Sequence, residues 1–492
     1  MPAIVGSLAQ LAEDMVHLRC RFYRRSLGKN FVMRVTLLGH AALLVEMGPM
    51  TILMDPVLPD PFEDGIVVSC PKREIDVQRL PPIDIIILSH RHPDHFDLPS
   101  LDRLSRNCQV CCPLDPLIAH ALKRLGFRHV TFLEPGKPMA LGKLEILPTQ
   151  SESRAVRECG IVFRDETGTF WNQVDTEISP ATIHTVLERC STVDLLFAMY
   201  AGQNFAFFES LDKSYPYETH RQNLKNVLMI HPRLTVPGFA GFRFFGDNEW
   251  LNRFLFPISR DLFLDDLRAL DATLEAAILH PADVVDINGG EVKVQQAASP
   301  LCRTLEDDTH QIGFNPADAI PPLHDSNPDG YVSGEMERNI SQVIEQDLFE
   351  YCLRHAQDRL QVAGRYFDCK AIFAIEVIFA DFRIEWTIDF STDPVRLYRT
   401  RNPQANVVHR IAASALYGWI LRRKSFFYVR AYSRRFTTSH RVYQDDAGAH
   451  VIPVQLPDLL MHYLIYAAQD SSDSALRRTD YEIMQMKRTC FS

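Results

Sequence analysis

Residues 83–95 read IDIIILSHRHPDH, and this stretch predicts both a strand and a metal site. Its first half, Ile83–Ser89, is a short continuous apolar run, which is typical of a strand buried on both faces of a sheet. Its second half places His90, His92, Asp94 and His95 within six residues. Imidazole and carboxylate groups suit first-row transition metals. In extended backbone His90 and His92 point the same way and are expected to bind one ion, while Asp94 and His95 lie past the turn and can serve a second.

The segments around this loop predict alternating strands and helices, hence an α/β architecture with helices covering sheets. Strands are expected at 31–38, 42–46, 51–55, 129–133, 143–149, 159–164, 169–174, 193–198, 233–238 and 284–294, and helices at 98–106, 114–125, 179–190, 217–229 and 261–272. A stretch rich in Pro, Asp and Asn, 314–330, predicts a linker. Beyond it we expect a separate α+β unit with helices at 335–358 and 404–421 and strands at 371–380, 382–390, 394–399 and near 424–435.

Composition excludes several classes of protein. A net charge of −10 over 492 residues leaves no excess of Lys and Arg, which argues against a nucleic-acid partner. Residues 8–25 carry apolar side chains three to four apart, so the region 1–30 is expected to be an amphipathic N-terminal helix. No apolar run approaches twenty residues, so no membrane span is expected. Eleven scattered cysteines fit reduced thiols, and therefore a cytoplasmic protein.

The HxHxDH motif after an apolar strand resembles the metallo-β-lactamase superfamily, and the order of elements over residues 33–300 is similar to that of the family. The resemblance implies an α/β metallo-β-lactamase αββα sandwich as catalytic domain, residues 31–313, with an additional C-terminal α+β domain at 331–492. This second domain loosely resembles sterol-carrier-like domains. Asp175, which follows a strand, matches the family's bridging aspartate and is expected to be catalytic as well. We expect His40 and Asp55 to be buried, hydrogen-bonded supports.

One departure from the hydrolytic members of that family concerns the first metal. They supply a third histidine from the loop after the strand that ends near Thr149, but residues 130–174 contain no histidine. This loop offers carboxylates instead. Glu152 is expected to be the metal ligand and a catalytic residue, with Glu158 as the alternative. A carboxylate in place of an imidazole makes a harder site that favours iron over zinc, and the same exchange distinguishes the oxygen-activating diiron branch of the fold.

A second departure concerns the family's final histidine ligand. The strand end at 236–241 reads VPGFAG, with Ala240 where that histidine is expected, so Asp247, His280 or no residue replaces it. This pattern is similar to the metallo-β-lactamase-like part of the CMP-N-acetylneuraminate and UDP-N-acetylmuramate hydroxylases. Those enzymes carry a Rieske domain with paired Cys-x-His ligands, and no Cys-x-His pair is present here. The resemblance therefore implies an external electron donor of the ferredoxin or reductase type. Stand-alone diiron hydroxylases of this fold occur in natural-product pathways, including the platensimycin-type diterpenoid pathway.

These features together predict a non-heme diiron monooxygenase. It would hold two Fe ions, use O₂ as co-substrate, and hydroxylate an unactivated C–H bond of a small hydrophobic acid or acyl thioester. The alternative is a dizinc hydrolase of a phosphodiester, lactone or thioester. An apolar pocket is expected from a set of aromatic residues near the site mouth: Phe205, Phe207, Phe208, Phe239, Phe242, Phe244, Phe245 and Trp250.

Overall fold

The computed structural model describes residues 32–153, 156–200, 203–205, 207–208, 212–238, 241–425, 428–429, 436–446, 450–454, 456–467 and 474–489. The helix expected at 1–30 lies outside them. The chain forms two compact units, the first comprising 1–203 and 215–315 and the second 204–214 and 316–492. The division falls within the expected linker. The segment 204–214, which we expected in the first domain, groups with the second unit instead.

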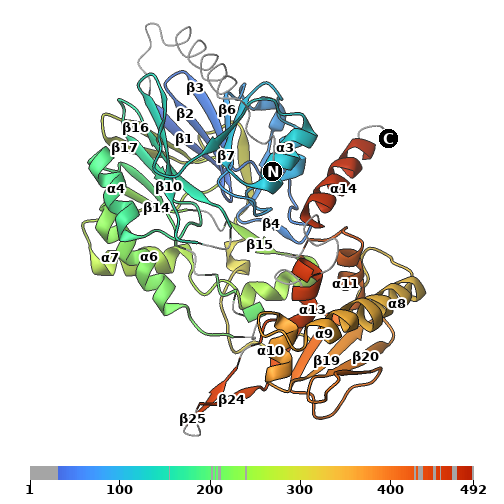
Figure 1. Cartoon of the computed structure of the whole chain (residues 1–492). Helices are drawn as coiled ribbons and strands as arrows, with labels where there is room; N and C mark the ends of the chain where they lie inside the picture. Colours follow the sequence, from blue (N-terminus) through green and yellow to red (C-terminus); the bar gives the residue numbers. More distant parts are fainter. Residues whose placement is uncertain are drawn as a thin grey trace. The chain divides into compact units, whose positions relative to one another are not determined.

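Eight strands form the first sheet of unit 1, in the order β17-β16-β1-β2-β3-β6-β7-β8 (Figure 1). They are β1 (Met33–Gly39), β2 (Ala42–Met47), β3 (Met50–Met54), β6 (Ile85–Ile87), β7 (Gln109–Pro113), β8 (Val130–Leu133), β16 (Val284–Asn288) and β17 (Glu291–Gln295). The run from β3 to β8 is parallel. β6 lies between β3 and β7 and all of its residues are fully buried, which confirms the prediction made from the apolar run.

Six strands form the second sheet, in the order β14-β13-β12-β11-β10-β9. They are β9 (Met139–Leu141), β10 (Leu144–Gln150), β11 (Cys159–Arg164), β12 (Thr169–Asn172), β13 (Leu195–Ala198) and β14 (Leu234–Pro237). Successive residues alternate between its two faces, as the pleat requires. In β12, for example, Phe170 belongs to the core shared with the first sheet, while Trp171 packs with helices α4 (Pro180–Cys190), α6 (Tyr217–Ile230) and α7 (Arg260–Leu270).

The main core lies between the two sheets. It combines alternate residues of β1, β2, β3 and β6 with those of β10 to β14, including the stacked rings of Phe163 and Phe170, whose centroids are 5.5 Å apart. The parallel strands β6, β7 and β8 are joined through helices α2 (Leu98–Asp102) and α3 (Pro116–Leu125). Since the inner face of the sheet is occupied, these crossover helices cover its outer face. Unit 1 is therefore an αββα sandwich, as expected.

Six short strands of the first unit were not predicted, namely β7 of the first sheet, β9 of the second sheet and four strands that lie outside both sheets. β4 (Val67–Ser69) pairs with β15 (Phe242–Phe244), and β5 (Lys72–Ile75) pairs with β18 (Cys302–Glu306). Short 3₁₀ turns lie at Val77–Arg79, Gly246–Arg253 and Thr309–Gln311. The β4–β15 pair matters for function because it joins two loops, 60–70 and 241–246, that are far apart in sequence.

The second unit contains a five-stranded sheet, ordered β21-β20-β19-β22-β23, and is an α+β unit as expected. Its strands are β19 (Ile372–Ile378), β20 (Arg383–Asp389), β21 (Arg396–Tyr398), β22 (Val407–Ala412) and β23 (Phe436–His440), and a separate hairpin is formed by β24 (Tyr443–Asp446) and β25 (His450–Pro453). Its helices are α8 (Ser333–Gln342), continued through a π segment (Val343–Leu348) into α9 (Phe349–His355), then α10 (Val362–Asp368), α11 (Ala413–Ile420), α13 (Leu459–His462) with a π turn (Tyr463–Ala467), and α14 (Ser474–Thr489).

One sequence prediction for the second unit is wrong. The helix expected at 404–421 is strand β22 followed by helix α11, because 407–412 pairs with both β19 and β23. The linker predicted at 314–330 contains the boundary between the units, and one of its residues is packed. Asp325 is fully buried and its carboxylate accepts hydrogen bonds from the Ser414 backbone N–H, at 2.8 Å, and from the Ser414 hydroxyl. The sterol-carrier resemblance stays a prediction. Among the described residues, no helix has the length and apolar character needed to cross a membrane.

Candidate metal centre

The loop after β6 folds into a tight turn that exposes little of its histidines. The backbone N–H groups of His95 and Phe96 both donate to the carbonyl of His92, at 2.9 and 2.8 Å. Both His90 and His95 are fully buried, and their ring centroids lie 4.3 Å apart. The turn thus gathers these imidazoles at the carboxyl end of the first sheet, as the sequence predicts.

His90, His92 and Asp175 form the first of two groups whose side-chain atoms could hold one metal ion. The Nε2 atom of His90 lies 2.7 Å from Nδ1 of His92 and 3.4 Å from Oδ2 of Asp175. The same carboxylate oxygen lies 3.9 Å from Nδ1 of His92. Asp175 follows β12 through Val174, whose φ of +55° is uncommon for a β-branched residue and turns the chain toward the histidines.

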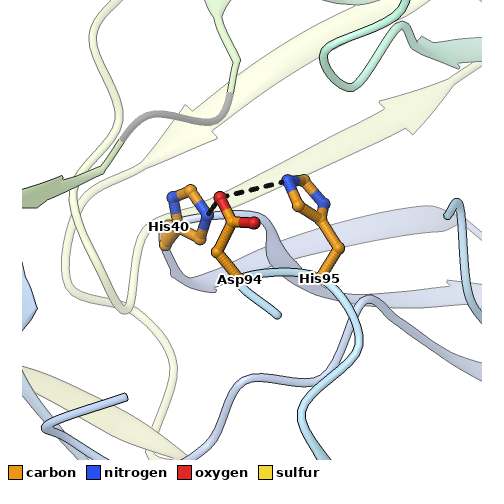
Figure 2. A group of neighbouring side chains, drawn as sticks. All are labelled: His40, Asp94 and His95. Atoms are coloured by element: carbon orange, nitrogen blue, oxygen red, sulfur yellow. Dashed lines mark hydrogen bonds and ion pairs between the residues drawn. The ribbon is translucent and has the colours of Figure 1, made fainter. Parts of the chain in front are cut away.

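His40, Asp94 and His95 form the second group (Figure 2). In it Oδ2 of Asp94 lies 3.2 Å from Nε2 of His40 and 3.7 Å from Nε2 of His95. The remaining oxygen of Asp175, Oδ1, lies 3.9 Å from Nε2 of His95. Asp175 therefore presents one carboxylate oxygen to each group, which is the geometry of a bridging ligand.

His40 was expected to be a support, and the structure instead groups it with Asp94 and His95. It follows β1 in the left-handed region, with φ +47°, and is buried against Gly241. A Cβ atom on Gly241 would lie 3.0 Å from the His40 Cα, so the glycine permits the close approach of the two loops. The candidate group thus includes an imidazole from the end of β1. A histidine directly after an apolar strand was the sequence signal.

Asp55 is a support, as expected. It follows β3, is fully buried, and its carboxylate accepts hydrogen bonds from the Ser89 N–H and the Ser89 hydroxyl, both at 2.7 Å. His95 Nδ1 lies 3.0 Å from the same carboxylate, and Ser89 Oγ lies 2.9 Å from His90 Nδ1. With the Ser89 hydroxyl donating to Asp55, His90 Nδ1–H donates to Ser89. This network keeps both Nε2 atoms available as ligands.

Electrostatics of the two groups suit a cation. Burial lowers the pKa of His90 to about 3, so this imidazole is a neutral ligand. Burial also opposes the charge on His95, but the carboxylates of Asp175 and Asp94 overcome it and raise its pKa to about 10. Burial acts to raise the pKa values of Asp94 and Asp175, yet neighbouring histidines hold both well below their usual range. Without a metal, a protonated His95 therefore offsets part of the negative charge of Asp94 and Asp175.

Two buried atoms in this site point to a ligand. The Nε2 atom of His95 and the Oδ1 atom of Asp175 face each other at 3.9 Å, and neither has a hydrogen-bond partner among the residues that the structure describes. Unpaired buried polar atoms are costly. A metal ion bound between them would satisfy both, so the residues present fit a two-metal centre.

The loop carboxylates are placed differently from the first expectation. The Glu152 side chain is exposed, and its backbone N–H donates to the Glu177 carbonyl at 2.9 Å. Glu158 is half-buried, and its carboxylate accepts a 2.6 Å hydrogen bond from the Ser151 hydroxyl. Burial, and then the charge of Asp175, raise the pKa of Glu158 to about 7, while the Ser151 hydrogen bond and His92 oppose the rise. Of the two alternatives, Glu158 is therefore the one within electrostatic reach of Asp175 and His92, and the two candidate metal groups found among the described residues contain neither glutamate. Exposure argues against Glu152 as a ligand.

The other proposed replacements do not join either group. Asp247 is exposed in the first turn of the 3₁₀ segment that begins at Gly246. His280 follows α7 and β14 in sequence, and its backbone N–H donates to Asp283 at 2.8 Å. Within the described part of the chain, the two candidate metal groups contain neither residue. His40 takes the place that we had assigned to one of them.

Comparison with known proteins supports the fold of unit 1. Residues 51–205 match the family described as a beta-lactamase superfamily domain. A curated Mycolicibacterium smegmatis protein named as a Rieske 2Fe-2S iron–sulfur protein is 25% identical over 182 residues, which is 35% of this chain and 34% of that protein. The chain thus spans about a third of the length of this relative.

Solved structures resemble part of the chain at low identity. CmlA, a diiron β-hydroxylase from Streptomyces venezuelae, is 18% identical with a TM-score of 0.36, covering 52% of this chain and 54% of CmlA. An isothiocyanate hydrolase from Delia radicum gut bacteria is 17% identical with the same TM-score, 0.36, covering 54% of this chain and 100% of the hydrolase. Residues 51–205, which lie mostly in the first unit, are thus similar to the beta-lactamase superfamily domain.

Proposed function

We propose that this chain is a non-heme diiron monooxygenase that hydroxylates an unactivated C–H bond of a small hydrophobic acid or acyl thioester, of the natural-product type. The observation that carries the proposal is the donor set. We assign Glu158 to the first position, where hydrolases of this fold place a third imidazole, because it lies within electrostatic reach of Asp175 and His92, and Asp175 presents an oxygen to each group. Oxygen-rich, anionic donor sets favour iron over zinc. Bound iron would supply the activation of O₂.

Each residue of the site then has a definite task. His90, His92 and Glu158 would hold one iron and His40, Asp94 and His95 would hold the other, with Asp175 placed between the two groups. Together with Asp175, these ligands come from four separate loops, so the fold itself holds the two ions together. Asp55 and Ser89 fix the histidine tautomers.

The surroundings of the second position support a hydrophobic substrate. The His40 ring stacks on Phe62 at 5.8 Å and meets the edge of Phe242 at 5.2 Å, and both phenyl rings are buried. Phe242 continues into Phe244 and Phe256. An apolar wall beside the metals excludes water and favours apolar carbon near the site. Of the other aromatic residues expected here, Phe239 lies outside the described residues, and Phe205, Phe207 and Phe208 belong to the second unit.

Electrons and location are further parts of this proposal. A separate ferredoxin or reductase-type protein would supply the electrons, and the relative named for a Rieske centre supports a redox role. None of the nine described cysteines forms a disulfide, which supports a reducing compartment such as the cytoplasm.

Metal analysis of protein produced with both iron and zinc available tests this function. We expect about two irons per chain and near-ultraviolet absorption that disappears on reduction. About two zincs per chain with a featureless spectrum would overturn the proposal and make hydrolysis the working function.

A matched pair of variants tests the donor set. E158Q should lower iron retention by about 10- to 100-fold, because it removes the carboxylate that we assign to the first position. E152Q, in the same loop but exposed, should bind iron as the wild type does. Loss of iron in E152Q but not in E158Q would show that the carboxylate assignment is wrong.

A further inference from the structure

A tight turn between β3 and β4 contains another acidic residue, Glu63, whose side chain interacts with Asp94 of the second group. In this turn the Phe62 N–H donates to the Val67 carbonyl at 3.0 Å, and the Gly65 N–H donates to the Phe62 carbonyl at 3.1 Å. The pairing of β4 with β15 anchors the turn. Phe62, the neighbour of Glu63, stacks on His40. The turn is therefore held against one of the candidate ligands.

Glu63 is a buried acidic residue, and burial is unfavourable for a charged carboxylate. Only 9% of the residue is exposed, and its Oε2 atom has no hydrogen-bond partner among the described residues. The side chain shares a hydrogen bond with Asp94, a member of the second group. Two carboxylates in such contact require a proton or a cation between them.

Cations already in the neighbourhood do not account for this arrangement. His95 attracts the carboxylate of Glu63, but its imidazole is hydrogen-bonded to Asp55 and faces Asp94 and Asp175. No ion pair between Glu63 and a Lys or Arg is found in the described part of the chain. An unpaired buried carboxylate costs free energy unless it binds hydrogen donors or a metal ion.

We propose that Glu63 is a further carboxylate ligand of the metal ion at the second position, beside His40, Asp94 and His95. This inference rests on the two-metal centre of the proposed function, but not on the metal being iron. It adds an anionic oxygen to a position that holds two imidazoles and Asp94. The position becomes harder and more anionic, and therefore retains a cation more firmly.

Binding of Co(II) alone to the metal-free protein tests the proposal without any turnover. Calorimetric titration of the wild type should show two equivalents. In E63Q we expect one equivalent to weaken by about 10- to 100-fold and the other to be unchanged. The glutamine amide in E63Q can still donate a hydrogen bond to Asp94, so a purely structural role predicts wild-type affinities. D64N, which removes a charge from the adjacent residue, serves as the control and should change either affinity by less than about fivefold.

E63D provides a second variant that keeps a carboxylate. It should recover part of the affinity that E63Q loses, and the visible spectrum of bound Co(II) should differ between E63Q and the wild type. Two wild-type equivalents in E63Q, or equal losses in E63Q and E63D, would overturn the proposal. If the wild type retains zinc rather than iron while E63Q still weakens one equivalent, the proposed oxygenase function fails and the role of Glu63 stands.

Discussion

Replacing Asp55 by asparagine should lower the metal affinity of both positions, although Asp55 is not itself a proposed ligand. The carboxylate of Asp55 accepts from the Ser89 N–H, the Ser89 hydroxyl and His95 Nδ1–H, at 2.7, 2.7 and 3.0 Å. Asparagine has one accepting atom and one donating amide nitrogen. In either orientation its NH₂ group faces at least one of these donors. The tautomer of His95, and that of His90 through Ser89, then lose their support.

The expected magnitude follows from the role of such outer hydrogen bonds. Loss of a partner behind a metal ligand typically lowers metal affinity by about 10- to 100-fold, or about 1.4–2.7 kcal/mol. Loss of one hydrogen bond to a charged acceptor has a similar size, about 1.5–3 kcal/mol. We therefore expect D55N to bind each metal at least about tenfold more weakly, measured by competition with a chromophoric chelator.

Asp84 supplies the matched control for this experiment. It is also buried and acidic, lies at the opposite end of the same two strands, and accepts a 3.1 Å hydrogen bond from the Thr51 N–H. D84N should lose some stability but bind metal within about threefold of the wild type, because it is not behind a ligand. Metal affinity in D55N equal to that of D84N and the wild type would refute the reasoning.

Three further predictions concern stability and reactivity. Removal of metal by a chelator should lower the melting temperature of the first unit by roughly 5–10 °C, since saturation at 100 times Kd contributes about 2.7 kcal/mol; an unchanged melting curve would contradict a bound metal. The second prediction uses a variant in which the two cysteines outside the described residues are changed to serine. A thiol reagent at pH 8 should label Cys369 of this folded protein first, because the other described cysteines are buried and burial raises the pKa of Cys111, for example, to about 12. Mass spectrometry of the labelled peptides checks the order of labelling. G364A should destabilise the second unit by about 1–3 kcal/mol or more, since its Cβ would lie 1.9 Å from the Asp358 carbonyl oxygen, whereas G334A, whose nearest neighbour is 3.7 Å away, should be neutral in denaturant unfolding.

Local sequence was sufficient for the part of the site that is contiguous in the chain. The apolar strand and the four residues of the HxHxDH loop lie within thirteen residues, so their convergence depends only on a strand followed by a turn. Asp175 after β12 was identified through the family resemblance, not from its own local pattern. Alternation of apolar residues likewise predicted most strands of the two sheets.

Contacts between distant segments could not be predicted in the same way. His40 joins the second position because β1 ends beside the loop that contains Gly241, and Glu63 approaches Asp94 because β4 pairs with β15. Neither β4 nor β15 has a periodic signal, since both strands are three residues long. The choice between Glu152 and Glu158 depended on how the loop turns, which composition does not encode.

The error at 404–421 has a different physical origin. Residues 407–412 are apolar at spacings that fit a helix as well as a buried strand, and short apolar runs do not discriminate the two. Their β-branched members favour a strand, and pairing with β19 on one side and β23 on the other decides the outcome. Only the tertiary structure supplies these partners.

A crystal structure of the metal-loaded protein, with anomalous data collected at the iron and zinc absorption edges, tests the central claim most directly. We expect two peaks at the iron edge. One should lie among His90, His92 and Asp175, and the other among His40, Asp94 and His95. Two peaks visible only at the zinc edge would contradict the oxygenase proposal. A single peak, or peaks away from these residues, would contradict the two-metal centre itself.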